Sequence, residues 1–303
     1  MKILIVGSKG FIGQNVSKYF ESQGYEVCNA DVVVDYVNSS NYFLIDASNA
    51  DFNFIFEKTA FDVCINCSGA ASVPDSLKNP LRDYYLNTVN VFKILEAIKK
   101  LQPKCKFINL SSAAVYGNPQ QLPIKETDIV NLVSPYGVHK YQAEQICTEF
   151  YQFFGIQTCT LRIFSAYGEG LQKQLFWDLY HKAKSGKPFT LFGTGEESRD
   201  FIYIKDLIKC IELSMLHSHF KSDIINIANG EEIYIKDVVS TFFSFFNEKI
   251  NYIFAGEERK GDPSNWFADI SRLKAMGYIS EYSIYQGLEK YYKWLNILNQ
   301  NNE

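Results

Sequence analysis

The sequence predicts an α/β protein with a doubly wound parallel sheet. Two observations support this prediction: short apolar segments alternate with helical patterns from the first residue, and the helical patterns are long enough to cross over a sheet. Strands covered by helices on both faces are apolar throughout rather than alternating. Residues 2–7, KILIVG, have this character and are expected to form a buried first strand.

The other elements of the sheet follow in chain order. Residues 11–24 show a helical pattern that closes at Gly24, and residues 25–31 form the expected second strand. Further strands are predicted at residues 42–48, 62–69, 104–112 and 158–168, with a long helix over residues 80–102.

The alternation becomes irregular after about residue 168, where a helix at 172–186 precedes a short strand at 189–193. We therefore expect residues 1–169 to form the first domain and residues 170–303 to form mainly a smaller second domain. Roughly residues 201–228 are expected to return to the first domain.

Composition argues against several functions. The 303 residues carry a net charge of -4 with a pI near 5.7, which disfavours nucleic acid or a membrane surface as a general partner. No apolar run reaches membrane-spanning length. The seven cysteines lie mostly in apolar runs and predict reduced core residues of a cytoplasmic protein. Cys64 and Cys67 have redox-motif spacing inside a predicted buried strand, and no redox or metal site is predicted.

Three glycines join the first strand to the first helix. Gly7, Gly10 and Gly13 in GSKGFIG would let the backbone approach a pyrophosphate that rests on the helix N-terminus. Asp31 ends the next strand and is suited to bind both ribose hydroxyls of an adenosine. No Arg or Lys occurs between Asp31 and Lys58, so this loop offers no cation to a 2′-phosphate. The sequence therefore favours NAD over NADP.

The segment SPYGVHK places a tyrosine and a lysine at the start of a helix. Ser134 is a good N-cap and Pro135 fits the first helical position of a helix that ends at Gly155. Tyr136 and Lys140 are four residues apart and therefore point to the same side. An ammonium near a phenol favours the phenolate, which would make the tyrosine a usable base. Taken alone, the pair could also be two side chains that merely share a helix face.

Together, these motifs resemble those of the extended short-chain dehydrogenase/reductase family, in its nucleotide-sugar epimerase/dehydratase branch. The likeness covers nearly the whole chain and includes, in the family's order, GSKGFIG, LSSAAVYG, SPYGVHK, LRIFSAYGEG, GTGEESRDFIYIKDL and RKGDPSNWFADISRLKAMGY. It implies a Rossmann-type doubly wound sheet with a smaller, partly interleaved C-terminal domain that binds a nucleotide-diphosphate sugar. It also implies that NAD contacts Gly7, Gly10, Phe11, Ile12, Gly13, Asp31, Asn87, Tyr136 and Lys140.

The resemblance assigns catalytic roles by motif position. Tyr136 would be the general base and acid for a sugar hydroxyl or ketone, and Lys140 would hold the nicotinamide ribose and lower the pKa of the tyrosine. The catalytic Ser/Thr of the family corresponds to Ser112, with Ser111 as a weaker candidate. On the substrate side, the resemblance implies contacts from Ser112, Ser165, Arg199, Arg259 and Asp262, in which the two arginines bind the diphosphate and Asp262 lies near the nucleoside ribose.

Several reactions stay open. Ala113 and Ala114 replace the Asp-Glu pair of dehydratases, and methyl groups cannot move protons, so 4,6-dehydration is not expected. An NAD-dependent 4-epimerase would pass hydride to a retained NAD and back to the opposite face of a 4-keto sugar. A 4-reductase would instead reduce a nucleotide-linked 4-keto-6-deoxy sugar with NADH or NADPH. Asp31 favours the epimerase, whereas Ser165 replaces an asparagine usual in the family. A non-catalytic NAD-binding regulatory subunit is the third alternative.

The resemblance also bears on oligomeric state. Family members commonly pair through two long helices, which here would be the helix that contains Asn87 and the one that follows Tyr136. Their Tyr and Phe side chains would suit a dimer interface, and we expect a homodimer. Simple coverage of the sheet would explain the same side chains nearly as well.

Overall fold

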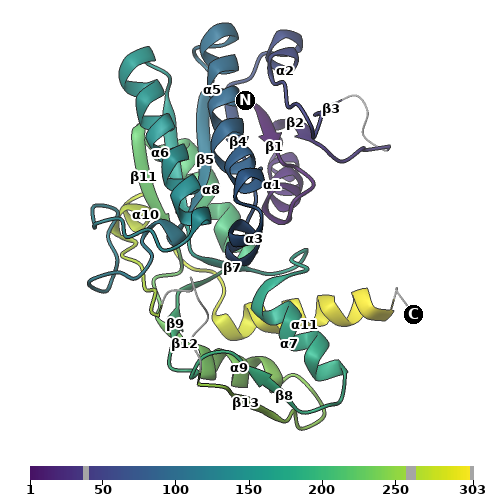
Figure 1. Cartoon of the computed structure of the whole chain (residues 1–303). Helices are drawn as coiled ribbons and strands as arrows, with labels where there is room; N and C mark the ends of the chain where they lie inside the picture. Colours follow the sequence, from purple (N-terminus) through teal and green to yellow (C-terminus); the bar gives the residue numbers. More distant parts are fainter. Residues whose placement is uncertain (37–40, 257–263, 301–303) are drawn as a thin grey trace.

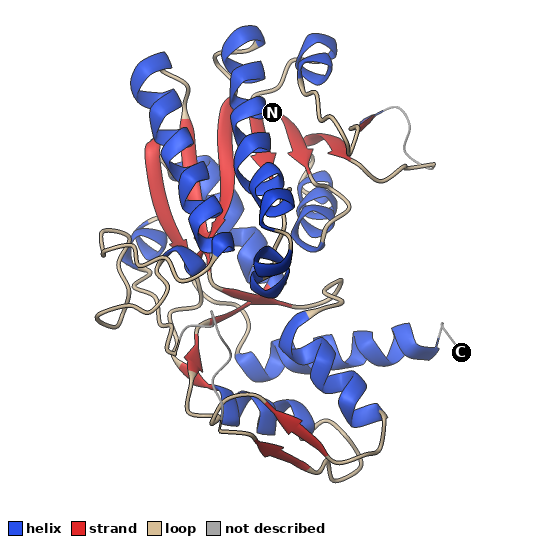
Figure 2. Cartoon of the chain, in the orientation of Figure 1, coloured by secondary structure: helices blue, strands red, loops and turns tan. Residues whose placement is uncertain are grey.

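The computed structural model describes residues 1–36, 41–256 and 264–300 (Figure 1). Its main sheet has seven strands in the order β11-β6-β5-β4-β1-β2-β3, and every pairing in it is parallel (Figure 2). The strands are β1 (Lys2–Val6), β2 (Glu26–Asp31), β3 (Tyr42–Leu44), β4 (Val63–Asn66), β5 (Lys106–Ser112), β6 (Thr158–Ile163) and β11 (Lys221–Ile227). The strand order reverses between β1 and β4, and such folds bind ligands at this crevice. The predicted doubly wound parallel sheet is confirmed.

Helices cover both faces of this sheet. They are α1 (Phe11–Ser22) and α8 (Ile204–His217) on one face, and α2 (Asn53–Lys58), α5 (Asn90–Leu101) and α6 (Pro135–Phe154) on the other. Ile3 and Ile5 of β1 pack into the first core, whereas Leu4 and Val6 pack into the second, as the alternation of a strand requires. No helix in the described part of the chain is long and apolar enough to cross a membrane.

The long helix predicted over residues 80–102 is interrupted near its start. A short helix, α3 (Val73–Lys78), precedes α4 (Pro80–Tyr84), which leads into one π-helical turn, η2 (Tyr85–Val89), before α5 begins. The side chain of Asn87 lies on this π-helical turn and is buried. Such turns inside α-helices are frequent at functional sites because they redirect a side chain.

The C-terminal part of the chain forms small two-stranded sheets below the main sheet in Figure 1. β7 (Ser165–Tyr167) pairs with β10 (Phe201–Tyr203) and not with the main sheet, so the single strand predicted over 158–168 is two strands. The remaining elements are β8 (Phe189–Leu191), β9 (Ser198–Arg199), β12 (Ile233–Tyr234), β13 (Tyr252–Phe254), α7 (Gln174–Lys184), α9 (Ile235–Phe243), α10 (Ser271–Ala275) and α11 (Ile284–Gln300). β11 lies beside β6 in the main sheet, and the proposed boundary after residue 169 stays a prediction.

A buried ion pair joins α6 to β6. Glu144 accepts hydrogen bonds from the Nη2 atom of Arg162 at 2.7 Å and from the hydroxyl of Ser111 at 2.5 Å. The side chains of Glu144 and Arg162 are 1% and 3% exposed, so water does not compete for these bonds. The Arg162 guanidinium also lies 4.7 Å from the centre of the Tyr116 ring. This network fixes the position of α6 against β5 and β6.

We predict that Glu144→Gln lowers the free energy of unfolding by about 3–5 kcal/mol, because it leaves the Arg162 guanidinium buried without its counter-ion. Urea denaturation measures this loss. Glu149→Gln makes the same change at an exposed position of α6 and is expected to alter stability by less than about 0.5 kcal/mol. Equal losses in the two variants would contradict the prediction.

Candidate active site

The loop between β1 and α1 permits a close approach of other groups to its backbone. Gly7 has a φ of +80°, and a Cβ atom there would lie 2.6 Å from the Cα atom of Ser68. A Cβ atom on Gly13 would lie 2.1 Å from the carbonyl oxygen of Gly7, so only glycine lets α1 pack against this loop. Gly10 is the N-cap of α1, which begins with Phe11. Because glycine has no side chain, it forms no side-chain hydrogen bond to the first N–H groups of this helix. These features fit the pyrophosphate of a dinucleotide.

Asp31 lies at the end of β2 beside this loop. Its carboxylate accepts hydrogen bonds from the backbone N–H of Lys9 at 2.8 Å and of Val32 at 2.7 Å. The Nζ atom of Lys9 lies 2.5 Å from the Oδ2 atom of Asp35, and the side chain of Asp35 is only 7% exposed. The segment between Asp31 and Lys58 contains no Arg or Lys, but the glycine loop supplies Lys9 as a cation beside it. Since Asp35 neutralises that cation and Asp31 adds a second carboxylate, the region still disfavours a 2′-phosphate.

The amide of Asn87 is buried without partners. Neither its Nδ2 nor its Oδ1 atom has a hydrogen-bond partner among the described residues. It extends toward the backbone that follows β4, where a Cβ atom on Gly69 would lie 2.4 Å from Asn87 Oδ1 and 3.4 Å from Lys140 Nζ. Buried polar groups are almost always satisfied, so an unpaired amide beside the crevice is a group that a bound molecule would complete. The residues present therefore fit a dinucleotide.

The first turn of α6 forms as predicted. Ser134 Oγ accepts a hydrogen bond from Gly137 N at 3.1 Å, Pro135 begins the helix, and Gly155 ends it with a φ of +67°. Gly137 has a second role, because a Cβ atom there would lie 2.7 Å from the carbonyl oxygen of Ala114. Glycine thus lets α6 approach the 3₁₀ turn that follows Ser112.

Tyr136 and Lys140 are both buried beside this turn. Burial raises the pKa of Tyr136 to about 12, although the hydrogen bond from the Ser112 side chain acts to lower it. Burial lowers the pKa of Lys140 to about 8, against the charges of Asp83 and Glu144, which raise it. The Nζ atom of Lys140 donates to the carbonyl oxygen of Leu110 at 2.9 Å and lies 6.0 Å from the centre of the Tyr136 ring. In the protein alone, burial therefore dominates the pKa of Tyr136, and the expected lowering of the phenol pKa by the ammonium is not seen.

The two candidate serines point in different directions. The hydroxyl of Ser111 donates to Glu144 in the core, as described above. The Oγ atom of Ser112 accepts a hydrogen bond from Ala114 N at 3.1 Å, and its residue is half-buried at the end of β5. Ser112 is thus the serine on the side of Tyr136, and it stays the candidate for contact with the reacting oxygen.

The residues predicted for the substrate side are described only in part. Arg199 of β9 donates through Nη1 to the carbonyl oxygens of Ser198 at 2.7 Å and Ser264 at 3.1 Å. Ser165 is half-buried at the start of β7. The other two predicted residues, Arg259 and Asp262, lie outside the described residues.

Sequence reasoning missed Trp266. Its Nε1 atom donates to the carbonyl oxygen of Gly117 at 2.9 Å, and its ring centre lies 5.4 Å from the Arg199 guanidinium. Trp266 therefore connects Arg199 to the chain that leaves the turn after Ser112. No spacing in the sequence marks this contact, because it joins segments about 150 residues apart.

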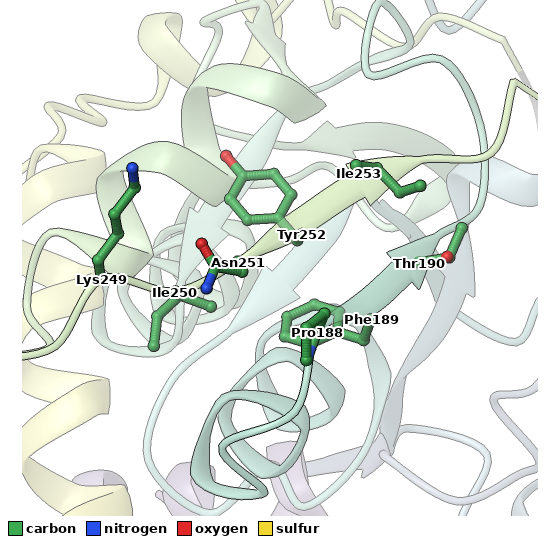
Figure 3. Close-up of a pocket in the computed structure, with 8 residues that line it drawn as sticks. All are labelled: Pro188, Phe189, Thr190, Lys249, Ile250, Asn251, Tyr252 and Ile253. Carbon is green, nitrogen blue, oxygen red and sulfur yellow. The ribbon is translucent and has the colours of Figure 1, made fainter.

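A cavity of about 420 Å³ lies away from these residues, between β8 and β13 in the C-terminal part (Figure 3). It is lined by Pro188, Phe189, Thr190, Lys249, Ile250, Asn251, Tyr252 and Ile253. None of the residues predicted for catalysis or cofactor binding lines it. Within the described ranges, no group of three or more His, Cys, Asp and Glu residues could hold a metal ion.

The fold and the site define a doubly wound α/β protein whose glycine loop fits a dinucleotide and whose sheet has a buried tyrosine–lysine pair at its carboxyl edge. Residues 3–228 match the NAD dependent epimerase/dehydratase family, and the chain belongs to this family. The resemblance seen in the sequence is therefore confirmed.

Several relatives align over almost the whole chain. A Bacillus subtilis protein named an uncharacterized UDP-glucose epimerase is 29% identical and covers 99% of both chains. The chain is also similar to the crystal structure of a UDP-glucuronic acid 4-epimerase from Bacillus cereus, determined in complex with UDP-glucuronic acid and NAD. The two sequences are 27% identical, the TM-score is 0.88, and the match covers 98% of this chain and 100% of the Bacillus cereus chain. A Methanobrevibacter ruminantium UDP-N-acetylglucosamine 4-epimerase, in complex with UDP-N-acetylmuramic acid, is also 27% identical with a TM-score of 0.88 and covers 98% of each chain.

We predict that the protein binds NAD more tightly than NADP, because Asp31 repels a 2′-phosphate while Asp35 neutralises Lys9. Asp31→Ser should weaken NAD binding about tenfold or more, by loss of charged hydrogen bonds to the ribose, and should reduce the preference over NADP. Calorimetric titration with each nucleotide measures both effects.

Asp46→Ser, in the exposed loop after β3, is the matched control and should leave both affinities unchanged. Equal affinity of the unaltered protein for NAD and NADP would contradict the assignment of Asp31.

Proposed function

We propose that the protein is an NAD-dependent nucleotide-sugar 4-epimerase that keeps its NAD between turnovers. The observation that carries the proposal is the grouping of Tyr136, Lys140 and Ser112 beside the unpaired amide of Asn87. The relatives that support it are named for epimerisation at position 4 of UDP-linked sugars or for UDP-glucose epimerisation, but they differ in the sugar itself. A UDP-linked hexose is therefore the proposed substrate class.

NAD, when bound, would supply a reversible acceptor for hydride. Tyr136 would take the proton of the sugar's 4-hydroxyl and return it to the ketone oxygen of the transient 4-keto sugar. The hydroxyl of Ser112 would donate a hydrogen bond to that same oxygen. Lys140 has three N–H donors, and with one bound to Leu110 the others would hold ribose hydroxyls.

The burial of Tyr136 has a direct consequence for this chemistry. With a pKa near 12, its phenol keeps its proton at neutral pH, so it is a poor base in the protein alone. A positive charge brought next to the ring would favour the phenolate. Activation of the base would therefore depend on an occupied cofactor site.

Substrate binding falls to the C-terminal part in this proposal. Arg199 and Arg259 would bind the diphosphate, because guanidinium groups match the geometry of phosphate oxygens. Asp262 would lie near the nucleoside ribose, and Ser165 would line the pocket for the sugar. Ser165 is smaller than the asparagine that is usual in the family at this position. For this reason a second candidate function stays open, the reduction of a nucleotide-linked 4-keto-6-deoxy sugar by the same catalytic residues.

A panel of UDP-, GDP-, CDP- and dTDP-sugars, followed by NMR, tests the proposal. Interconversion of two epimers without added cofactor is expected. Turnover of a keto sugar alone, with one NADH or NADPH consumed per product, would establish the reductase instead. Binding of NAD without conversion of any sugar would favour the non-catalytic regulatory subunit.

We predict that Tyr136→Phe lowers kcat about 10²- to 10⁴-fold on the sugar that turns over, because the ring can no longer accept a proton. NAD binding, measured by calorimetry, should be retained. Tyr141→Phe makes the same change on the same helix, outside the proposed site, and should leave kcat unchanged. A Tyr136→Phe variant with full activity would exclude this tyrosine as the base.

The proposal includes a homodimer formed by α5 and α6, which lie side by side on one face of the sheet (Figure 1). Large apolar side chains are exposed on these helices and on the segments before α5. They are Leu77, Leu81, Tyr84, Tyr85, Phe92, Phe153 and Phe154. Such a surface is more apolar than a monomer needs, and a second copy of the chain would cover it.

Light scattering after size exclusion should therefore give a dimer at micromolar concentration. Phe153→Glu on α6 should produce a monomer, because it places a charge in the interface. Ile297→Glu alters a comparably exposed residue of α11 and should leave the dimer intact. A monomer in the unaltered protein would refute this part of the proposal.

A further inference from the structure

Asp83 of α4 is a buried carboxylate that no sequence motif singled out. Its side chain is 0% exposed, and its Oδ2 atom lies 2.6 Å from the Nδ1 atom of His139. Its other oxygen, Oδ1, has no hydrogen-bond partner among the described residues. A buried carboxylate with an unsatisfied oxygen is costly to fold, so its placement needs a reason.

The position of Asp83 relative to the catalytic pair supplies that reason. α4 packs against α6, and Asp83 lies about one turn before Asn87 on the same run of helix. The Asn87 amide adjoins the Lys140 ammonium, since a Cβ atom on Gly69 would lie 2.4 Å from Asn87 Oδ1 and 3.4 Å from Lys140 Nζ. The negative charge of Asp83 raises the pKa of Lys140 and, to a lesser degree than burial does, that of Tyr136. The backbone around this contact is held by Thr88 of η2, whose hydroxyl donates to the carbonyl oxygen of His139 at 3.0 Å.

Other charged and titratable groups surround this contact. On α6, Glu144 also raises the pKa of Lys140, and Cys67 does so from the chain after β4. On α3, the Oδ2 atom of Asp75 lies 3.0 Å from the Nη1 atom of Arg82 of α4. Arg82 is therefore paired with Asp75, whereas Asp83 is paired with His139. The ring of Tyr84 lies edge-on to His139, with 5.4 Å between ring centres.

We propose that Asp83 is a positioning residue for the catalytic pair: its carboxylate, anchored by His139, keeps Lys140 in its ammonium form inside the protein. Burial works against that form, since an ammonium removed from water tends to lose its proton. Two carboxylates counter this tendency, Glu144 one helical turn further along α6 and Asp83 across from it on α4. Glu144 is already bound to Arg162 and Ser111, whereas Asp83 has no cationic Arg or Lys partner of its own in the described structure.

The purpose of this arrangement rests on the proposed function, because a charged Lys140 matters for ribose binding and for the Tyr136 phenolate. The test of the proposal is independent of the proposed function, because the titration of Lys140 can be followed without substrate or cofactor. Protein labelled with [ε-¹³C]lysine reports each lysine by NMR between pH 6 and pH 10. The Lys140 signal is assigned by its absence from a Lys140→Arg variant.

In Asp83→Asn, the titration midpoint of Lys140 is expected to fall by about one pH unit, because a negative charge has been removed from its surroundings. Asp75→Asn removes the same charge from the neighbouring α3 and should leave the midpoint where it is. An unchanged midpoint in Asp83→Asn, or an equal fall in both variants, would overturn the proposal. If Asp83→Asn does not fold, Asp83→Ser, which is smaller and admits water, makes the same comparison.

A second readout follows activity on a sugar that the panel has shown to turn over. Removal of Asp83 lowers the pKa values of both Lys140 and Tyr136, so the pH–kcat profile of Asp83→Asn should move to lower pH. A purely structural role would reduce kcat at every pH without moving the profile. Absence of any turnover in the panel would count against the proposed function and leave the NMR result decisive for Asp83.

Discussion

The close packing of α6 against β5 and β6 is the constraint on which the site depends. Gly137 lets the helix approach the turn after Ser112, and the buried pair of Glu144 and Arg162 fixes the next turns of the helix. Because Tyr136 and Lys140 lie on the part of α6 that these contacts hold, their distance from the end of β5 is determined by packing and not by a flexible loop. A site held in this way needs little rearrangement when ligands bind.

The same packing creates an electrostatic conflict. Removal from water raises the pKa of Tyr136 and lowers that of Lys140, so burial alone works against the charged form of each group. Carboxylates near Lys140 oppose this for the lysine, while nothing among the described side chains does so strongly for the tyrosine. In the proposed reaction, proton transfer by Tyr136 would therefore depend on what binds beside it, so that the site would react only when both ligands are present.

Local patterns in the sequence predicted much of this structure. The caps of α6, the glycine loop and most of the buried strands depend on neighbours within a few residues, and these formed as expected, although the strand predicted over residues 42–48 is limited to Tyr42–Leu44. Contacts between distant segments were not predictable in this way. The π-helical turn at Asn87, the departure of β7 from the main sheet and the salt bridge between Lys9 and Asp35 each depend on tertiary packing. Asp83 was missed because its importance lies in what surrounds it and not in any motif.

The central claim is that Tyr136 acts with an NAD that stays bound through both half-reactions. A deuterium label at C4 of the sugar nucleotide tests it most directly, with the product examined by NMR and mass spectrometry and no cofactor added. Retention of the label at C4 of the epimer is the predicted result, because the hydrogen would leave and return within one occupied site. Loss of the label to solvent would contradict the claim. So would the appearance of the label in free NADH when the reaction is repeated with NAD added to the solution.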